Sequence, residues 1–338
     1  MALLTCMLAF ASCSLAGQAP PQQRPTAVPR PALAVPLGAA VNYNALINDA
    51  RYRDLLRATF SMVVPENEMK FDAIEPEQGQ FNFQRADAIV TFAEDNNMWV
   101  RGHTLVWEQQ LPAWLTNGHF TRDELMRILK EHILTEVGHF RGRVKTWDVV
   151  NEALAGTGLR DDLWLRVIGP DYIKWAFIWA HEADPQAQLY YNDYADQDGP
   201  KADALYTLVT NLRSQGVPIA GVGLEMHVDA RQPPDAQAVA ATMRRFAAAG
   251  FQVAITEMDV MLQHLTGSLQ SQYQTQAAIY RAFALDCRQA PNCKFFTTWG
   301  VCDQYSWIIA ATHHADAPLL FDKNYQPKPA LYAVTGAL

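Results

Sequence analysis

The chain has 338 residues, of which 49% are hydrophobic and 18% are charged, as in a soluble globular protein with a sizeable core. Its formal net charge of −8 at pH 7 argues against a polyanionic partner such as nucleic acid, because phosphate binding requires a basic face. The length alone allows one large domain or two of medium size. Nine Trp, twelve Tyr and fifteen Phe are compatible with sugar binding, because sugar C–H faces pack on aromatic rings, although most of these residues are expected in the core.

The N-terminal residues predict a leader followed by a spacer. Met1–Ala16 is an apolar run that is too short to span a bilayer and is typical of a signal peptide, so residues 1–17 are interpreted as a leader. The segment ending at Cys13 loosely resembles a lipoprotein cleavage site, which leaves a lipid anchor as the alternative to simple export. No Lys or Arg precedes the run, so the true start of the chain stays open. Residues 18–36 are rich in proline and predict an extended linker. We therefore expect an extracellular or envelope-anchored protein with no membrane span.

Residues 37–338 alternate short apolar runs with longer amphipathic stretches. The clearest helix covers residues 121–137, because Thr121 and Glu124 form a capping box and apolar residues then recur at helical spacing. Eight strands alternating with helices predict a single-domain α/β protein with a (β/α)8 TIM barrel, although a doubly wound sheet fits the pattern nearly as well. The expected strands are Leu37–Val41, Ser61–Val64, Trp99–Thr104, Val144–Val150, Gln188–Asn192, Ile219–Leu224, Val253–Thr256 and Phe295–Trp299.

Polar or aromatic side chains stand at the C-terminal tips of seven of these strands. One such tip is unremarkable, since caps and turns use Asn, Asp and Glu routinely. In a barrel, however, all tips converge on one face, which is where active sites form. In strand order, the tip residues are Glu66, Asn67 and Lys70; His103 and Trp107; Asn151 and Glu152; Asn192, Asp193 and Tyr194; Glu225 and His227; Glu257 and Asp259; and Trp299.

Two glutamates among these tips suggest glycoside hydrolysis by a pair of carboxyl groups. One carboxyl must keep a proton near neutral pH, and the other must stay ionised beside the anomeric carbon. Glu152 follows an apolar WDVV strand and suits the protonated role, whereas Glu257 has a polar neighbourhood and suits the ionised one. A structural salt bridge is the alternative for either residue taken alone.

At this point the chain, from about Ala39 to Tyr332, resembles glycoside hydrolase family 10, the endo-β-1,4-xylanases. Each matching segment alone is moderately specific, but all of them in order are very specific. The segments begin at Val64 (VPENEMK), Arg101 (RGHTLVW), Trp147 (WDVVNEA), Tyr191 (YNDY), Ile255 (ITEMD), Thr298 (TWGV), Leu320 (LFD) and Lys328 (KPA).

The resemblance implies hydrolysis with retention of anomeric configuration. Glu257 would be the nucleophile and Glu152 the acid/base, with their carboxyl groups roughly 5–5.5 Å apart. Asn151 would hydrogen-bond the sugar 2-hydroxyl, and His227 would orient the nucleophile with support from Asp259. The resemblance implies no catalytic metal and no organic cofactor.

The resemblance also implies the substrate contacts. Glu66, Asn67, Lys70, His103 and Gln110 resemble the family's polar contacts on the glycone side, and Tyr194 and Glu225 are further expected contacts. Trp107, Trp299 and Trp307 resemble its aromatic walls. Xylose lacks the C6 hydroxymethyl group of glucose, so a tight wall from Trp299 and Trp307 favours xylan or xylo-oligosaccharides as the partner. We expect the enzyme to be a monomer.

Two residues depart from the family pattern. Glu225 stands where the family usually has Gln beside the nucleophile, so it would either repel Glu257 or carry a proton and donate a hydrogen bond to Glu257. Glu108, directly after Trp107, stands where the family commonly has His. Neither departure changes the pair of catalytic glutamates.

Three alternatives and one covalent feature stay open. The same chemistry could serve another β-1,4-linked substrate, or the barrel could be a binding protein that has lost turnover. A metal-dependent hydrolase would need a ligand cluster, which His103 and His227 on different strands do not provide by themselves. Cys287 and Cys293 could close a short disulfide loop, which requires an oxidising compartment and would leave Cys302 as a buried free thiol.

Overall fold

Eight parallel strands close into a barrel in the computed structural model, which describes residues 30, 32–194 and 199–338. Each strand pairs in parallel with its neighbours, and the last strand pairs with both the first and the one before it. An open doubly wound sheet would leave two unpaired edges, so the closed ring confirms the (β/α)8 barrel. Its strands are β1 Leu37–Val41, β2 Met62–Pro65, β3 Trp99–Val106, β4 Thr146–Asn151, β7 Gln188–Asp193, β8 Gly221–Leu224, β10 Gln252–Met261 and β11 Cys293–Thr298.

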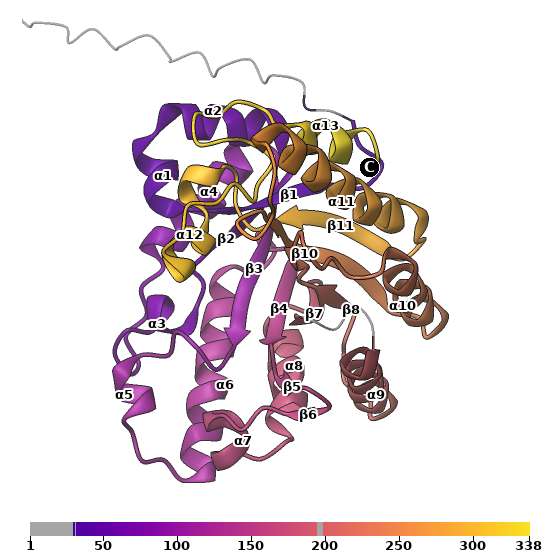
Figure 1. The fold of residues 1–338 in the computed structure, drawn as a ribbon. Helices are drawn as coiled ribbons and strands as arrows, with labels where there is room; N and C mark the ends of the chain where they lie inside the picture. The colour runs from indigo at the N-terminus through magenta and orange to yellow at the C-terminus, as the bar shows by residue number, and fades with distance from the viewer. Residues whose placement is uncertain (1–29, 31, 195–198) are drawn as a thin grey trace, which may run out of the picture.

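Helices surround the barrel and cover its outer face (Figure 1). The capping box of Thr121 and Glu124 is present, and the helix that it starts runs to His139, two residues beyond the predicted end. The helices are α1 Tyr43–Asn48, α2 Ala50–Thr59, α3 Phe71–Ile74, α4 Gln84–Asp95, α5 Ala113–Thr116, α6 Arg122–His139, α7 Leu163–Val167, α8 Tyr172–Ala183, α9 Gly199–Ser214, α10 Ala236–Ala248, α11 Leu269–Gln289, α12 Trp307–Thr312 and α13 Pro329–Thr335, with a 3-10 turn at Asp303–Tyr305.

Strand residues fill two separate hydrophobic layers. Most apolar side chains pack between the strands and the helices. A smaller cluster, which includes Met62, Val64, Tyr190 and Phe295, fills the barrel interior below Trp299. Burial on both faces explains why these strands are read as continuous apolar runs.

Two short strand pairs lie at the C-terminal end of the barrel. The β5 (Leu154–Ala155) and β6 (Gly158–Leu159) strands form an antiparallel hairpin directly after β4. The β9 strand (His227–Asp229) pairs with the end of β10. This pairing explains why β10 is longer than predicted, since polar residues after Thr256 interrupt the apolar run but continue the extended backbone.

The expected leader, with Cys13, lies outside the described residues, as does most of the expected linker. Its last residues contact the barrel: Val35 is buried in the core, and the Ala34 backbone N–H donates to the Leu338 carbonyl at 3.0 Å. Among the residues described, no helix is both long and apolar enough to cross a membrane. Cys287 on α11 and Cys293 on β11 form the disulfide that the spacing left open, with their Cα atoms 5.3 Å apart. Cys302 is a buried free thiol.

Candidate active site

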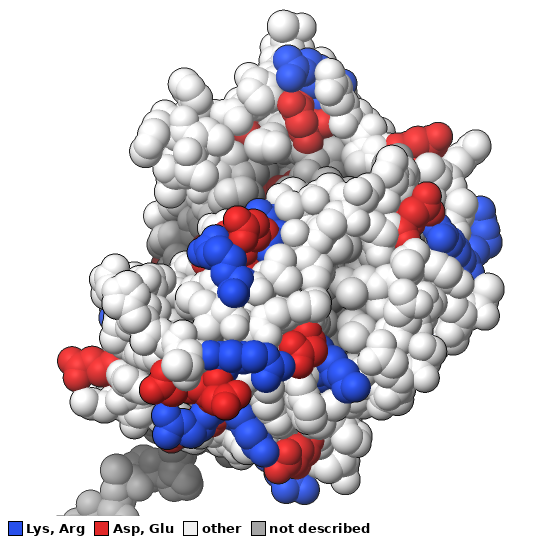
Figure 2. Space-filling view, turned by 90° about the horizontal axis from the view of Figure 1, so that it is seen from below, with Lys and Arg blue, Asp and Glu red and all other residues white. Residues whose placement is uncertain are grey.

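A cavity of about 740 Å³ opens at the C-terminal ends of the barrel strands. Figure 2 looks onto this side of the molecule and shows a hollow with acidic side chains inside it, and charges of both signs mixed over the surrounding surface. All fourteen predicted site residues line this one cavity: Glu66, Asn67, Lys70, His103, Trp107, Gln110, Asn151, Glu152, Tyr194, Glu225, His227, Glu257, Trp299 and Trp307.

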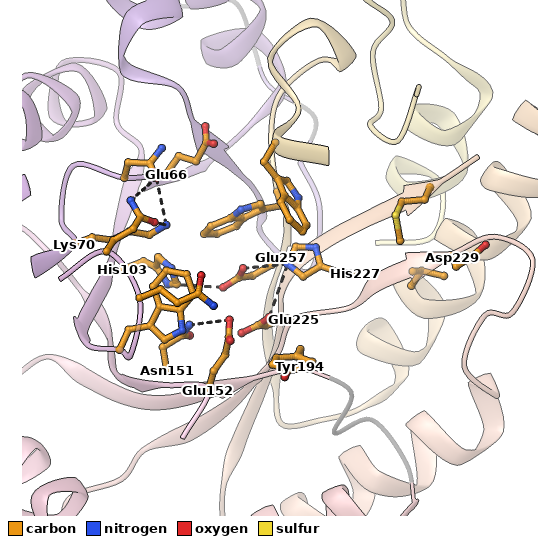
Figure 3. Close-up of a pocket in the computed structure, with 18 of the residues that line it drawn as sticks. Glu66, Lys70, His103, Asn151, Glu152, Tyr194, Glu225, His227, Asp229 and Glu257 are labelled. Atoms are coloured by element: carbon orange, nitrogen blue, oxygen red, sulfur yellow. Dashed lines mark hydrogen bonds and ion pairs between the residues drawn. The ribbon is translucent and has the colours of Figure 1, made fainter. Parts of the chain in front are cut away.

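Glu257 projects from β10 and is held by donors from three other strands. The Asn192 amide donates to Glu257 Oε1 at 2.7 Å. His227 Nε2 lies 3.3 Å from Glu257 Oε2 (Figure 3). Arg101 Nη2 lies 3.5 Å from Oε1. The carboxyl group is therefore buried, only 4% exposed, but surrounded by hydrogen-bond donors.

Those donors keep Glu257 ionised. Burial alone raises the pKa of a carboxyl group, but the charges of His103, His227 and Arg101 outweigh it and lower the pKa of Glu257 to about 2. Burial likewise lowers the pKa of His227, yet Asp259 and Glu257 outweigh it and raise that pKa to about 10. His227 is thus a protonated bridge at neutral pH, with Nδ1 3.0 Å from Asp259 Oδ1.

Below Glu257, an arginine and a histidine share one buried carboxylate. Arg101 Nε donates to both Asp148 oxygens, at 3.1 and 2.9 Å, and Arg101 Nη1 donates to the Thr256 carbonyl at 2.8 Å. His103 Nδ1 lies 2.8 Å from Asp148 Oδ2. Burial lowers the pKa of His103 against the opposing effect of Glu257 and Asp148, its Nδ1–H donates to Asp148, and the permanent charge near Glu257 is that of Arg101.

Glu152 enters the cavity from the tip of β4 and has a different environment. Its backbone φ of 53° lies in the left-handed region, which is uncommon outside glycine and is found at positions that the surrounding structure holds firmly. Burial raises the pKa of Glu152 to about 7, with a further contribution from the negative charge of Glu257. Glu152 therefore keeps its proton near neutrality, while Glu257 in the same cavity is ionised.

Glu225 lies beside the Glu257 carboxylate and shares a donor with it. The Asn192 amide donates to Glu225 Oε1 at 3.1 Å as well as to Glu257, and it contacts Asn151 Oδ1 at 2.8 Å. The Thr256 hydroxyl donates to Asn192 Oδ1 at 2.7 Å, which sets the orientation of the amide. Asn192 is the hub of this end of the site.

A polar cluster forms the side of the cavity next to α3. Lys70 Nζ donates to Gln110 Oε1 at 2.6 Å and to Asn67 Oδ1 at 3.3 Å, and it lies 4.9 Å from the Trp107 ring centroid. Burial lowers the pKa of Lys70 and raises that of Glu66 to about 7. These side chains offer several fixed hydrogen-bond donors and acceptors, as recognition of sugar hydroxyls requires.

Two tryptophans form the opposite wall. Trp299 is 7% exposed and meets the His103 ring edge-on at 5.0 Å between centroids. Trp307, at the start of α12, is 38% exposed, and its Nε1–H donates to Asp259 Oδ2 at 2.8 Å. Asp259 therefore orients both His227 and Trp307, which extends the supporting role expected for it.

The polar groups at the base of the site are better suited to ion pairs than to a metal ion. A protonated His227 has no free lone pair for a cation, and the Arg101 guanidinium already occupies Asp148. Among the described residues, two groups of three side chains bring ligand-type atoms within 4.8 Å of one another: His103, Asp148 and Glu257, and Glu225, His227 and Glu257.

Two residues of the site are not among the contacts expected from the sequence. Asn192 is expected only as a strand tip, although an amide that ends a buried strand is a signal for a hydrogen-bond hub, and it contacts Glu257 without lining the cavity itself. Arg160 lines the cavity next to Glu152. The sequence does not predict this position, because it depends on the hairpin of β5 and β6, which brings the chain back to Glu152. A buried arginine in the middle of a strand, Arg101, was a signal for the ion pair with Asp148.

The model of glycosyl hydrolase family 10 matches residues 31–337. An endo-1,4-beta-xylanase B from Thermotoga neapolitana is 43% identical over 298 residues, covering 88% of this chain and 86% of that protein. Native xylanase 10B from Thermotoga maritima superposes with a TM-score of 0.86 at 41% identity, covering 90% of this chain and 94% of that one. Xylanase 10B from Thermotoga petrophila RKU-1, solved in complex with xylobiose, has a TM-score of 0.86 at 42% identity, covering 90% and 93%. The family model spans nearly the whole chain, and these relatives cover most of it at more than 40% identity; this protein is an enzyme of glycosyl hydrolase family 10.

Proposed function

We propose that the enzyme is a retaining endo-1,4-β-xylanase, with Glu257 as nucleophile and Glu152 as acid/base. The single observation that carries the assignment of roles is the opposite shift of two pKa values in one cavity, to about 2 for Glu257 and about 7 for Glu152. A pair of carboxyl groups separated in this way supplies an ionised attacker and a proton donor at the same pH.

In the first step, Glu257 attacks the anomeric carbon while Glu152 gives its proton to the departing glycosidic oxygen. The bond to the leaving sugar breaks, and a covalent glycosyl-enzyme forms. In the second step, Glu152, now ionised, takes a proton from water as that water attacks the anomeric carbon and releases Glu257. The water attacks the anomeric carbon from the face that the leaving sugar has vacated, so the configuration is retained.

The other predicted residues support substrate binding in this proposal. Asn151, which accepts a hydrogen bond from the Asn192 amide, would bond the 2-hydroxyl of the reacting sugar, and this bond would strengthen in the transition state. The cluster around Lys70 would hold the glycone, and Trp299 and Trp307 would close the space that a hydroxymethyl group needs. All three of the similar proteins described above are named as xylanases, and one of them was solved with xylobiose, which supports xylan as the substrate class.

Export and a monomeric state also belong to the proposal. The disulfide between Cys287 and Cys293 supports export, because such bonds form and persist in oxidising compartments. Secretion and an anchor at Cys13 would be separated by fractionation of expressing cells, followed by the same measurement on Cys13→Ala. A monomer would elute near the chain mass of 37.8 kDa in size-exclusion chromatography with light scattering.

The function is tested by incubating the protein with glucuronoxylan and, in parallel, with carboxymethyl-cellulose. We expect early release of mixed xylo-oligosaccharides, with the β-anomer formed first by proton NMR, and no products from the cellulose. Glu257→Ala should abolish turnover. Glu152→Ala should lose most activity on xylan and regain turnover of an activated aryl xyloside when azide is added. Products of inverted configuration, or no turnover of either polymer at any pH, would refute the proposal.

A further inference from the structure

An ion-pair network adjoins Glu152 on the side away from Glu257. Arg160 Nε donates to the Glu152 carbonyl at 2.9 Å, and Arg160 Nη2 donates to the Tyr194 hydroxyl at 3.0 Å. Arg160 Nη1 lies 3.2 Å from Glu108 Oε1, and Nη2 lies 4.0 Å from Glu152 Oε2. One guanidinium therefore contacts the backbone and faces the carboxyl group of the same residue, while its charge is shared with Glu108.

The local fold is organised so that Arg160 returns to Glu152. The hairpin of β5 and β6 leaves the barrel after Glu152 and reverses, and the Arg160 N–H then donates to the Ala153 carbonyl at 2.8 Å. Trp164 on α7 donates from Nε1 to the Trp107 carbonyl at 2.8 Å, which holds the segment that carries Glu108 against the same helix. Both partners of the ion pair are thus fixed by backbone contacts, and both are largely buried, with side chains 19% and 26% exposed.

We propose that Arg160 is a positioning residue for Glu152, and that Glu108 determines how much of the Arg160 charge the Glu152 carboxyl group experiences. The inference rests on the proposed role of Glu152 as acid/base. Glu108 is one of the two departures from the family pattern. The structure gives it a partner and a consequence that the sequence alone did not.

The charges around Glu152 define the direction of the effect. Burial and the negative charges of Glu257 on β10 and Asp193 on β7 raise the pKa of Glu152, and Arg160 lowers it. Lys70 is close enough for its charge to interact with that of Glu152, and Asp193 is itself paired with Lys201 from α9, at 2.7 Å. Tyr194, a further titratable neighbour among the residues that the structure describes, is bound to Arg160 through its hydroxyl. Glu108 acts on this balance by partly neutralising Arg160.

The proposal is tested by the pH dependence of kcat/KM in three variants: Glu108→Gln, Arg160→Gln and the double variant. The substrate is xylotetraose, whose leaving group needs a proton. Glu108→Gln leaves the guanidinium charge uncompensated, so we expect the upper pH limit to fall by about half a unit or more. Arg160→Gln removes the positive charge, so the limit should rise by a similar amount. The double variant removes both charges and should lie close to wild type.

Two controls separate this effect from other causes. On 2,4-dinitrophenyl β-xylobioside, which needs no proton for departure, all four enzymes should share one pH profile; a purely structural role would instead lower activity on both substrates. Glu94→Gln and Arg143→Gln disrupt a matched ion pair, 3.0 Å between atoms, whose residues do not line the cavity, and they should leave the limit unchanged. The proposal would be overturned if the upper pH limits of Glu108→Gln and Arg160→Gln stayed at the wild-type value. It would also be overturned if the control variants shifted the limit by the same amount. If the wild-type enzyme showed no upper pH limit on xylotetraose, the proposed role of Glu152 would be refuted instead.

Discussion

Glu225 brings a third carboxyl group close to the nucleophile, Glu257. Both carboxyl groups accept a hydrogen bond from the side-chain amide of Asn192. Asn192 donates to Glu225 Oε1 at 3.1 Å and to Glu257 Oε1 at 2.7 Å. The two carboxyl groups also approach His227 Nε2 together, at 3.8 and 3.3 Å. Two ionised carboxylates at such short range repel each other strongly, so the arrangement favours one proton on the pair. Because Glu257 must be the ionised member to attack, we infer that Glu225 carries the proton in the working enzyme.

Replacing Glu225 with Gln should extend activity towards high pH. The measurement is kcat/KM on 2,4-dinitrophenyl β-xylobioside, because that substrate does not require the proton of Glu152. Above the pH at which Glu225 loses its proton, wild-type activity should fall about tenfold per pH unit, whereas Gln keeps its donor and the variant should stay on its plateau. Identical alkaline limbs for the two enzymes would contradict the inference, and Asp229→Asn, another acidic residue of the cavity wall, is the control for a general loss of charge.

On xylan the pH profile should instead report the two catalytic glutamates. Glu152 must be protonated to act as acid, and its pKa is raised to about 7, so kcat/KM should decline as the pH rises above about 7. Glu257 must be ionised, and its pKa is lowered to about 2, so activity should persist far into the acid range until unfolding intervenes. A steep acid limb between pH 4 and 5 in protein that is still folded would contradict this assignment, with folding monitored by circular dichroism.

At the scale of the element, close contact between neighbouring strands depends on glycines in the barrel wall. Gly102 on β3 lies against the ring of Trp147 on β4, and a Cβ atom at Gly102 would overlap with that ring. Trp147 is fully buried, so it has no space into which to move.

Gly102→Ala should therefore destabilise the barrel by about 1–3 kcal/mol, as overpacking of a buried site does. The measurement is the free energy of unfolding in urea. Gly138→Ala is the matched control, because Gly138 lies inside α6 with open space around its Cα, where alanine should raise stability by about 0.5–1 kcal/mol. Equal stability for wild type and Gly102→Ala would mean that Trp147 repacks, contrary to the prediction.

The sequence predicted the strands better than the contacts between them. Strands such as β1 are buried on both faces and produce apolar runs, so the periodicity located all eight of them. The tip residues could be predicted because parallel strands end on one face. Arg160 could not, because a hairpin without an apolar pattern decides where it lies. The end of β10 was also missed, since its continuation depends on pairing with β9 rather than on its own residues.

At the scale of the whole molecule, the ring closes between segments that are far apart in the chain. Strand β1 pairs with β11, and the last residue of the chain accepts a hydrogen bond from Ala34. Closure therefore requires β11 to be placed correctly. The disulfide between Cys287 and Cys293 ties the end of α11 to the start of β11, so it constrains the final strand at the position where the barrel closes.

This arrangement predicts which cysteines of the barrel react with iodoacetamide, mapped by peptide mass spectrometry. Cys302 is buried, and burial raises the pKa of its thiol to about 12, so it should be alkylated only after unfolding. Cys287 and Cys293 should resist alkylation even in the unfolded chain until a reductant is added, and then react together. Cys302→Ala should remove the alkylation that follows unfolding and leave the reductant-dependent alkylation of Cys287 and Cys293 unchanged. Alkylation of Cys302 in the folded enzyme would show that the region between β11 and α12 opens readily, and alkylation of Cys287 without reductant would show that the disulfide is not formed.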